Sequence, residues 1–142
     1  MKLKISKVKP EAVIPTKAHD SDIGFDMYAI SEEVVDKGDY GYIEYDTGIS
    51  VQPEPGYGCF IFPRSSISNT GLLLSNCVGV IDPGYTGSIK ARFKYVSKTK
   101  KYGVGDKICQ LVVLPIPKVE LEVTEELTAT DRNSNGFGSS GN

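Results

Sequence analysis

The sequence predicts an all-β fold, which can be a sandwich, a jelly roll or a β-barrel made of many short strands. Apolar residues recur at every second position in short runs, and clusters of Gly, Pro, Asp and Asn separate these runs. The chain has 142 residues, the length of a single domain. Its 15 Gly and 8 Pro residues leave little room for long helices.

The clearest strand pattern lies in residues 88–96. Ile89, Ala91, Phe93 and Tyr95 fall on one face of this segment, and the Lys and Arg residues between them fall on the other. Similar runs rich in β-branched and aromatic residues predict strands at 3–8, 25–30, 42–45, 58–62, 72–81, 108–114 and 119–123. In chain order, these segments supply the strands of the predicted fold.

Turn signals separate the predicted strands, at 37–39, 53–56, 82–84 and 103–106. In the Asp-Pro-Gly-Tyr turn at 82–85, proline and glycine occupy the second and third positions, which suits a type II turn. Apolar periodicity ends after Glu126. We therefore expect a β-barrel unit over residues 1–126 and a flexible arm over residues 127–142, within a single domain.

Composition and charge exclude several function classes. The 16 Lys and Arg residues nearly balance the 18 Asp and Glu residues, so a protein that coats nucleic acid is not expected. Cys59, Cys77 and Cys109 form no CxxC motif, and the single His19 cannot complete a His/Cys metal site. Each cysteine lies in an apolar run, which predicts three buried, reduced thiols.

Membrane and secretion segments are not expected either. No run approaches ~18 uninterrupted apolar residues. The first nine residues alternate charged and apolar side chains and lack the apolar block of a signal peptide. We therefore expect a soluble protein without membrane partners, in the cytoplasm or, if the protein is viral, in the interior of the host cell.

Residues 63–68, Pro-Arg-Ser-Ser-Ile-Ser, form a candidate anion site. Arg64 supplies a planar fork of donors, and Ser65 and Ser66 add hydroxyls beside backbone N–H groups, which suits a phosphate. The alternative is an ordinary turn or short helix that starts at the proline and is capped by serine.

Residues 79–87 form a second candidate site. Asp82 and Tyr85 lie at the two ends of an expected hairpin turn. A carboxylate there can orient or deprotonate a water molecule, and a ring can pack against a sugar. The alternative is that Asp82 only caps the turn.

The C-terminal segment 132–141 and two polar strand residues complete the candidates. Arg132, Phe137 and the surrounding glycine backbone can wrap an anion and stack on a planar base, whereas composition alone fits a solvated terminus. Asp26 and Gln110 lie in otherwise apolar strands, where each needs a hydrogen-bonding partner.

Taken together and in order, these segments resemble the five motifs of the homotrimeric deoxyuridine triphosphatase (dUTPase) family. The matching stretches are GFDMYA (24–29), PRSSIS (63–68), GVIDPGYTG (79–87), GDKICQLV (105–112) and RNSNGFGSSG (132–141). Five motifs in order, in a chain of the right length, favour the functional interpretation of these segments over ordinary turns and a solvated terminus.

The resemblance implies a jelly-roll β-barrel that assembles as a homotrimer with exchanged C-terminal arms. Each active site would combine the first, second and fourth motifs of one subunit, the third motif of another and the arm of the third. The implied reaction is hydrolysis of dUTP to dUMP and pyrophosphate, assisted by Mg²⁺ held mainly by the triphosphate and water. This activity would keep uracil out of DNA and supply dUMP for dTTP synthesis.

The resemblance also implies a role for each motif residue. Asp82 would be the general base for the water that attacks the α-phosphorus, and Asp26 and Gln110 would be the other catalytic residues. The residues implied to bind substrate are Arg64, Ser65 and Ser66 on the phosphates, Asn76, Val80 and Ile81 on uracil, Tyr85 on deoxyribose, Lys90 beside the base, and Arg132, Phe137, Gly138, Ser139 and Ser140 in the arm. No protein side chain is expected to hold the metal directly.

The arm departs from the family pattern, because Asn133 follows Arg132 where the family has glycine. Asn tolerates left-handed backbone angles, so we expect the bend to be kept. Two other functions share such a scaffold. A deoxycytidine triphosphate deaminase would need a glutamate in the hairpin region, and residues 72–91 contain none. A non-catalytic binding protein would not need Asp82, Tyr85 and the arm together.

Overall fold

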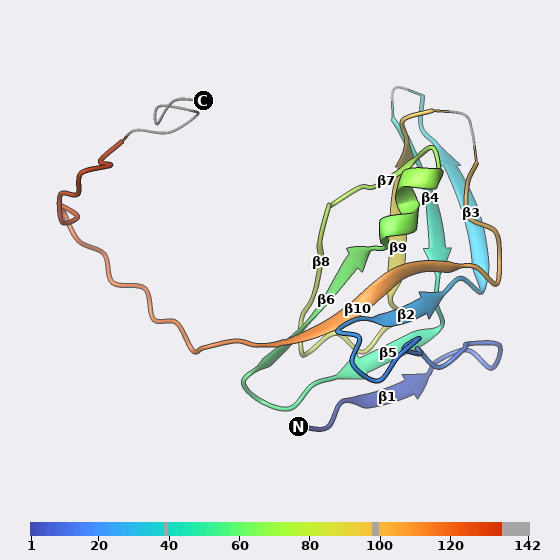
Figure 1. Ribbon diagram of the computed structural model, residues 1–142, viewed down its shortest axis with the longest axis horizontal. Helices are drawn as coiled ribbons and strands as arrows, with labels where there is room; N and C mark the ends of the chain where they lie inside the picture. Colours follow the sequence, from blue (N-terminus) through green and yellow to red (C-terminus); the bar gives the residue numbers. More distant parts are fainter. Residues whose placement is uncertain (39, 98–99, 135–142) are drawn as a thin grey trace.

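The computed structural model describes residues 1–38, 40–97 and 100–134 and shows an all-β protein (Figure 1). Its elements in chain order are β1 (Lys4–Lys7), β2 (Phe25–Tyr28), β3 (Ser31–Asp36), β4 (Gly41–Asp46), β5 (Ile49–Gln52), β6 (Tyr57–Pro63), the 3₁₀ helix η1 (Ser65–Asn69), β7 (Leu72–Leu74), β8 (Gly79–Ile81), β9 (Lys90–Tyr95) and β10 (Lys107–Pro115). The predicted all-β class is confirmed. In this described part of the chain, no helix is long and apolar enough to cross a bilayer.

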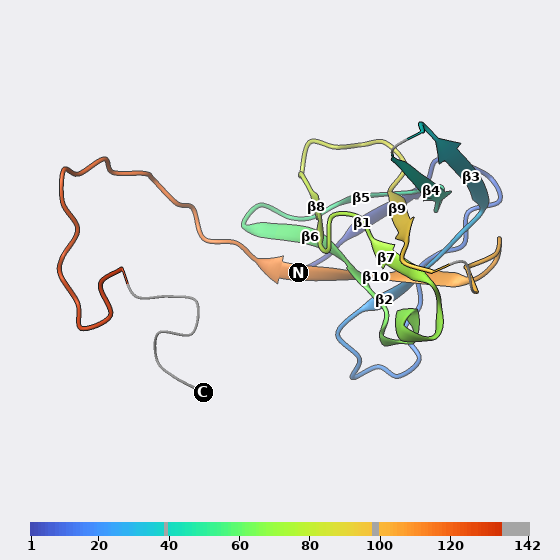
Figure 2. The same ribbon diagram turned by 90° about the horizontal axis from the view of Figure 1, so that it is seen from above.

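Within the described residues, the strands form two four-stranded antiparallel sheets and one two-stranded sheet. The large sheets have the orders β2-β10-β6-β8 and β3-β4-β9-β7, and β1 pairs with β5. Most neighbouring strands are not consecutive in the chain, as in a jelly roll (Figures 1 and 2). The large sheets share no ladder among these residues, so they do not form a closed cylinder.

The alternating pattern of the strands builds one hydrophobic core from residues of all the sheets. In β9, Ala91 and Phe93 are buried and the Lys and Arg residues between them are exposed, as the sequence predicts. Phe93 packs edge to face against Tyr45 of β4, with ring centroids 5.7 Å apart. Tyr95 lies at the end of β9 and is exposed, so the predicted apolar face stops one position earlier than expected.

The single strand predicted for residues 72–81 is two strands in the structure. A turn between β7 and β8 interrupts it, and the N–H of Cys77 donates to the carbonyl of Leu74 (3.0 Å). The two halves then join different sheets, β7 beside β9 and β8 beside β6. Ser75 and Asn76 are common in turns, and they are the sequence signal that the single-strand prediction overlooked.

The prediction of three buried thiols is wrong for Cys77. This residue is exposed in the turn, with a positive φ of 59°. Cys59 and Cys109 are buried, as expected, and burial raises the pKa of Cys109 to about 12. At neutral pH the Cys109 thiol is therefore protonated and unreactive.

The chain leaves the sheets after β10 and continues as an extended segment (Figures 1 and 2). The strand predicted for residues 119–123 is absent, although its residues alternate apolar and acidic side chains. Leu121 and Val123 are almost fully exposed, because no other described strand lies beside them. The sequence also does not predict β3, which is a largely exposed, acidic edge strand, or the short β5.

Candidate active site

The third predicted motif forms the connection from β8 to β9, which belong to different sheets. At its start, the N–H of Tyr85 donates to the carbonyl of Asp82 (2.9 Å). Gly84 has no positive φ, so this turn is not the type II turn that the sequence predicts. The segment is therefore a tight connection between sheets, and it does not form a paired hairpin.

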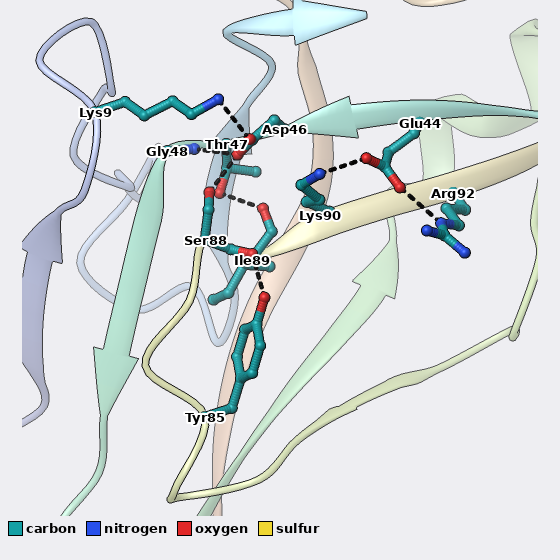
Figure 3. A network of polar contacts seen from close by, with 10 residues as sticks. All are labelled: Lys9, Glu44, Asp46, Thr47, Gly48, Tyr85, Ser88, Ile89, Lys90 and Arg92. Carbon is teal, nitrogen blue, oxygen red and sulfur yellow. Dashed lines mark hydrogen bonds and ion pairs between the residues drawn. The ribbon is translucent and has the colours of Figure 1, made fainter. Parts of the chain in front are cut away.

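Hydrogen bonds fix the end of this connection to β4 and to the residues that follow it (Figure 3). The Tyr85 hydroxyl donates to the carbonyl of Ser88 (2.7 Å), and Thr47 Oγ1 donates to the carbonyl of Ile89 (2.7 Å). The Ser88 hydroxyl donates to the buried carboxylate of Asp46. Burial raises the pKa of Asp46, but donors led by Ser88 hold that pKa below its usual value. The Tyr85 ring is thus oriented before any ligand arrives.

A cavity of about 450 Å³ opens beside this connection. Six residues that the sequence assigns to substrate line it, namely Asn76, Val80, Ile81, Asp82, Tyr85 and Lys90. Ile61 and Leu74 add apolar walls. A concave site with apolar walls and a few polar groups is typical of small-molecule binding. We call it the nucleoside cavity.

Glu44 and Arg92 also line the nucleoside cavity, and the sequence analysis did not identify them. The Glu44 carboxylate accepts hydrogen bonds from Lys90 Nζ (2.6 Å) and Arg92 Nε (2.7 Å) (Figure 3). Burial raises the pKa of Glu44, but these two donors hold it below its usual value. The alternating pattern of residues 88–96 predicts that Lys90 and Arg92 lie on the exposed face of this strand. It does not predict that β4 pairs with β9, which places Glu44 opposite Arg92.

Residues of the first, second and fourth motifs meet at the buried carboxylate of Asp26. Arg64 Nε donates to Asp26 Oδ1 (2.9 Å), and Lys107 Nζ lies 2.9 Å from Asp26 Oδ2. Burial raises the pKa of Asp26, but the hydrogen bonds and charges of Lys107 and Arg64 hold it below its usual value. The prediction that Asp26 needs a partner is confirmed. Two cations around one carboxylate leave a net positive charge, which suits a phosphate chain.

The helix η1 follows β6 after Arg64 and supplies the serines of the second motif. A short helix is one of the alternatives expected from the sequence, but this helix begins at Ser65 and not at the proline, and no serine side chain caps its start. Arg64 Nη1 donates to Ser66 Oγ (3.1 Å). Arg64, Ser66 and Lys107 line a second cavity, of about 400 Å³, which we call the phosphate cavity. Ser65 is exposed and is not part of this lining.

Gln110 lies directly opposite Asp26 in the ladder between β10 and β2. Residues opposite each other in an antiparallel pair project from the same face of the sheet. Gln110 is half-buried. The sequence prediction that Asp26 and Gln110 serve the same region is therefore consistent with the register.

The nucleoside cavity and the phosphate cavity do not meet within one chain. They share no lining residue. Ile81, next to Asp82, pairs with Cys59 in β6, and Arg64 lies five positions further along the chain from Cys59. In the same register Asp82 falls opposite Gly58, six positions from Arg64, so at about 3.4 Å per residue the two are separated by about 20 Å along β6. One chain therefore carries two separate candidate binding cavities.

The described residues of the fifth motif, 132–134, lie in the segment that leaves the sheets after β10. Arg132 lines neither cavity. Asn133 has a positive φ of 41°, which confirms that it adopts the left-handed conformation expected of it. Four arm residues assigned to substrate lie outside the described residues, namely Phe137, Gly138, Ser139 and Ser140.

The side chains near the two cavities can be compared with those that bind a metal ion directly. Within residues 1–38, 40–97 and 100–134, no group of three or more His, Cys, Asp or Glu side chains could hold a metal ion. Cations already engage both carboxylate oxygens of Asp26. These residues fit an Mg²⁺ ion that binds through substrate phosphates and water.

Comparisons with known proteins identify the family of this chain. The family model described as dUTPase matches residues 10–141. Proteins named deoxyuridine 5′-triphosphate nucleotidohydrolase from Clostridium acetobutylicum and Helicobacter pylori are 34% and 37% identical, over 98% and 99% of this chain and 96% and 97% of theirs. A solved structure of a mutant dUTPase of Staphylococcus bacteriophage 80alpha with dUpNHpp has a TM-score of 0.81 at 25% identity, and the match covers 99% of this chain and 98% of that chain. The chain therefore belongs to the dUTPase family of dUTP-hydrolysing enzymes.

Proposed function

We propose that the protein hydrolyses dUTP to dUMP and pyrophosphate by attack of one water molecule on the α-phosphorus. The observation that carries this proposal is the nucleoside cavity, in which Asp82 and Tyr85 lie beside the residues expected to contact uracil. The related phage dUTPase structure with dUpNHpp supports a deoxyuridine nucleotide as the ligand.

The nucleoside cavity suits deoxyuridine by shape and by polarity. Asn76 and the backbone of Val80 and Ile81 supply polar groups for the uracil edge, and a narrow pocket excludes the thymine methyl group. Cytosine presents a mismatched donor, and a polar mismatch discriminates strongly because it leaves buried groups unpaired. The Tyr85 ring, held by Ser88, packs on the deoxyribose and crowds out a 2′-hydroxyl.

Asp82 acts as the general base. Its side chain is exposed at the nucleoside cavity, and no hydrogen bond or ion pair from another described residue engages the carboxylate. The water oxygen forms a bond to the α-phosphorus while the bond from that phosphorus to the bridging oxygen of the β-phosphate breaks. Asp82 accepts the proton of the water, and pyrophosphate leaves.

The phosphate cavity holds the triphosphate. Arg64 and Ser66 in its lining bind phosphate oxygens, and Arg64 does so as a planar fork. Ser65 and Gln110, which lie outside this lining, bind the part of the phosphate chain that extends beyond it. Asp26 positions Arg64 and Lys107 through its two ion pairs. Because the donors are fixed before substrate binds, positioning and charge stabilisation supply most of the rate.

The triphosphate binds together with Mg²⁺. Mg²⁺ neutralises phosphate charge when it is bound and keeps several of its waters. With Mg²⁺ bound, Asp26 would hydrogen-bond to the water molecules around the ion or help to orient that site. No protein side chain would be a direct ligand of the ion.

A complete active site combines subunits of a homotrimer. The separation of the two cavities within one chain supports this arrangement, because the residues expected on the base and those expected on the phosphates line different cavities. The catalytic barrel comprises residues 1–126, with the arm over 127–142. In the arm, Arg132, Phe137, Gly138, Ser139 and Ser140 close over the γ-phosphate and uracil. Lys90 lies beside the base.

This activity keeps uracil out of DNA and supplies dUMP for dTTP synthesis, in the cytoplasm or, for a viral protein, in the host cell interior. The experiment that tests it is pyrophosphate release from dUTP, UTP, dTTP and dCTP. We expect release from dUTP at least ~10²-fold faster than from the others. Equal rates on all four nucleotides, or ammonia release from dCTP, would refute the proposal.

A further inference from the structure

Tyr102 carries a buried hydroxyl that the motifs do not explain. Its side chain is only 7% exposed, and among the described residues its Oη has no hydrogen-bond partner. Its ring packs edge to face against Tyr45 and Phe93, with centroids 6.2 Å and 5.6 Å apart. A buried hydroxyl without a partner carries a desolvation cost that a phenylalanine would avoid. We therefore looked for a group that can form a hydrogen bond with this hydroxyl when a ligand is bound.

The Tyr102 side chain reaches the phosphate half of the site. It lines the phosphate cavity together with Arg64, Ser66 and Lys107. Ser66 and Arg64 are neighbours of Tyr102 in this lining. Burial raises the pKa of Tyr102, whereas the Ser66 hydroxyl and the Arg64 charge act in the opposite direction. Packing against the core fixes where the hydroxyl ends, because the ring cannot turn away.

Ser66 depends on Arg64 in this arrangement. Arg64 Nη1 donates to Ser66 Oγ (3.1 Å), while Arg64 Nε donates to Asp26. Arg64 Nη1 carries a second hydrogen and Nη2 carries two more, so the guanidinium can bind a phosphate while it still donates to Ser66. The Ser66 oxygen has a second lone pair that can accept from another donor, and its own hydrogen is free to reach a phosphate oxygen.

We propose that Tyr102 is a positioning residue for phosphate binding. When the Arg64 guanidinium engages the triphosphate, the Tyr102 hydroxyl donates to Ser66 Oγ and aims the Ser66 hydrogen at a phosphate oxygen. This inference rests on the proposed function, because it requires a triphosphate at Arg64 and Ser66. It assigns to Tyr102 a role that depends on substrate, while its ring serves the core in all states.

Tyr102→Phe tests the inference, with Tyr45→Phe as the matched control. Tyr45 belongs to the same aromatic cluster, but its hydroxyl has a permanent partner, the carbonyl of Tyr102 (2.8 Å). For Tyr102→Phe we expect an unchanged or higher Tm, about a 10-fold weaker Kd for dUpNHpp and a similar loss of kcat/KM for dUTP. For Tyr45→Phe we expect a lower Tm with kcat/KM within about twofold of the parent enzyme.

Ser66→Ala and the double variant Ser66→Ala/Tyr102→Phe complete a mutant cycle. If Tyr102 acts through Ser66, the second substitution costs nothing further in dUpNHpp affinity once Ser66 is alanine. An independent further loss of about 10-fold in the double variant would overturn the inference, as would full affinity in Tyr102→Phe. The affinity measurements are independent of turnover, so a parent enzyme that binds dUpNHpp without hydrolysing dUTP would contradict the proposed function and leave this test valid.

Discussion

Asp26, Glu44 and Asp46 are buried carboxylates, and donors from other parts of the chain surround each of them. They position cations or backbone at the edges of the two cavities. Asp82 differs from them, because it is exposed and no other described residue engages its carboxylate. At the scale of the residue, Asp26, Glu44 and Asp46 hold other groups in position, whereas the Asp82 carboxylate is free to accept a proton, as the proposed mechanism requires.

Asp82→Asn removes the proposed general base with almost no change in volume. We expect dUpNHpp to bind about as tightly as before, and kcat for dUTP to fall by ~10² or more. Asp20→Asn, which changes an exposed carboxylate outside both cavities, is the control. Stopped-flow turnover and calorimetric binding would check both variants. Normal turnover in Asp82→Asn would contradict the assignment of the base.

The buried carboxylates also make a prediction about pH. The folded-state pKa values of Asp26, Glu44 and Asp46 all lie below their usual values. A depressed pKa contributes stability that is complete above the usual carboxyl pKa and is lost as pH falls through the folded pKa. The free energy of unfolding should therefore be flat above about pH 6 and should decline below about pH 4.

Asp46→Asn tests the source of this acid dependence. At pH 7 we expect the loss of about 1–3 kcal/mol of unfolding free energy, because buried donors lose a charged acceptor. We also expect a shallower decline below about pH 4 than in the parent protein. Glu120→Gln is the control, since Glu120 and its partner Lys118 are both largely exposed. Denaturant titrations across the pH range measure both effects, and an unchanged acid limb in Asp46→Asn would be evidence against the account.

At the scale of the element, the sequence predicts a strand best where one face of the strand is buried and the other is exposed to solvent. Residues 88–96 show this alternation, and β9 follows it. The turn between β7 and β8 has a sequence signal in Ser75 and Asn76, whereas the positive φ of Cys77 has none, because cysteine rarely adopts that conformation. Residues 119–123 carry the same alternation, but no described strand lies beside them. An alternating pattern therefore shows that a segment is suited to a strand, but a strand forms only where a neighbouring strand is present.

The connection from β8 to β9 provides a matched pair of glycine substitutions. A Cβ at Gly87 would lie 2.7 Å from the Tyr85 hydroxyl oxygen, whereas a Cβ at Gly84 would meet nothing within 4 Å. Gly87→Ala should displace the Tyr85 ring, break its hydrogen bond to Ser88 and lower kcat/KM for dUTP by about 10-fold. Gly84→Ala should remain within about twofold of the parent enzyme. If the two variants behave alike, the proposed role of the oriented Tyr85 is wrong.

At the scale of the whole molecule, the candidate residues separate into two groups that one chain does not bring together. The sequence motifs identify most members of both groups, because Asp26, Arg64 and Asp82 each lie in a recognisable segment. The motifs do not identify Glu44, which reaches the nucleoside cavity only through the pairing of β4 with β9. They also do not reveal the distance between the cavities, because that distance depends on the register of β6 and β8.

Mixing two inactive variants tests the shared active site most directly. Asp82→Asn disables the nucleoside half and Arg64→Ala disables the phosphate half. If each site combines these halves from different subunits, refolding the two variants together at equal amounts should restore up to roughly a quarter of the parental dUTP turnover. Each variant refolded alone serves as the control. Mixtures no more active than the separate variants, with mixed oligomers verified by mass spectrometry, would contradict an active site shared between subunits.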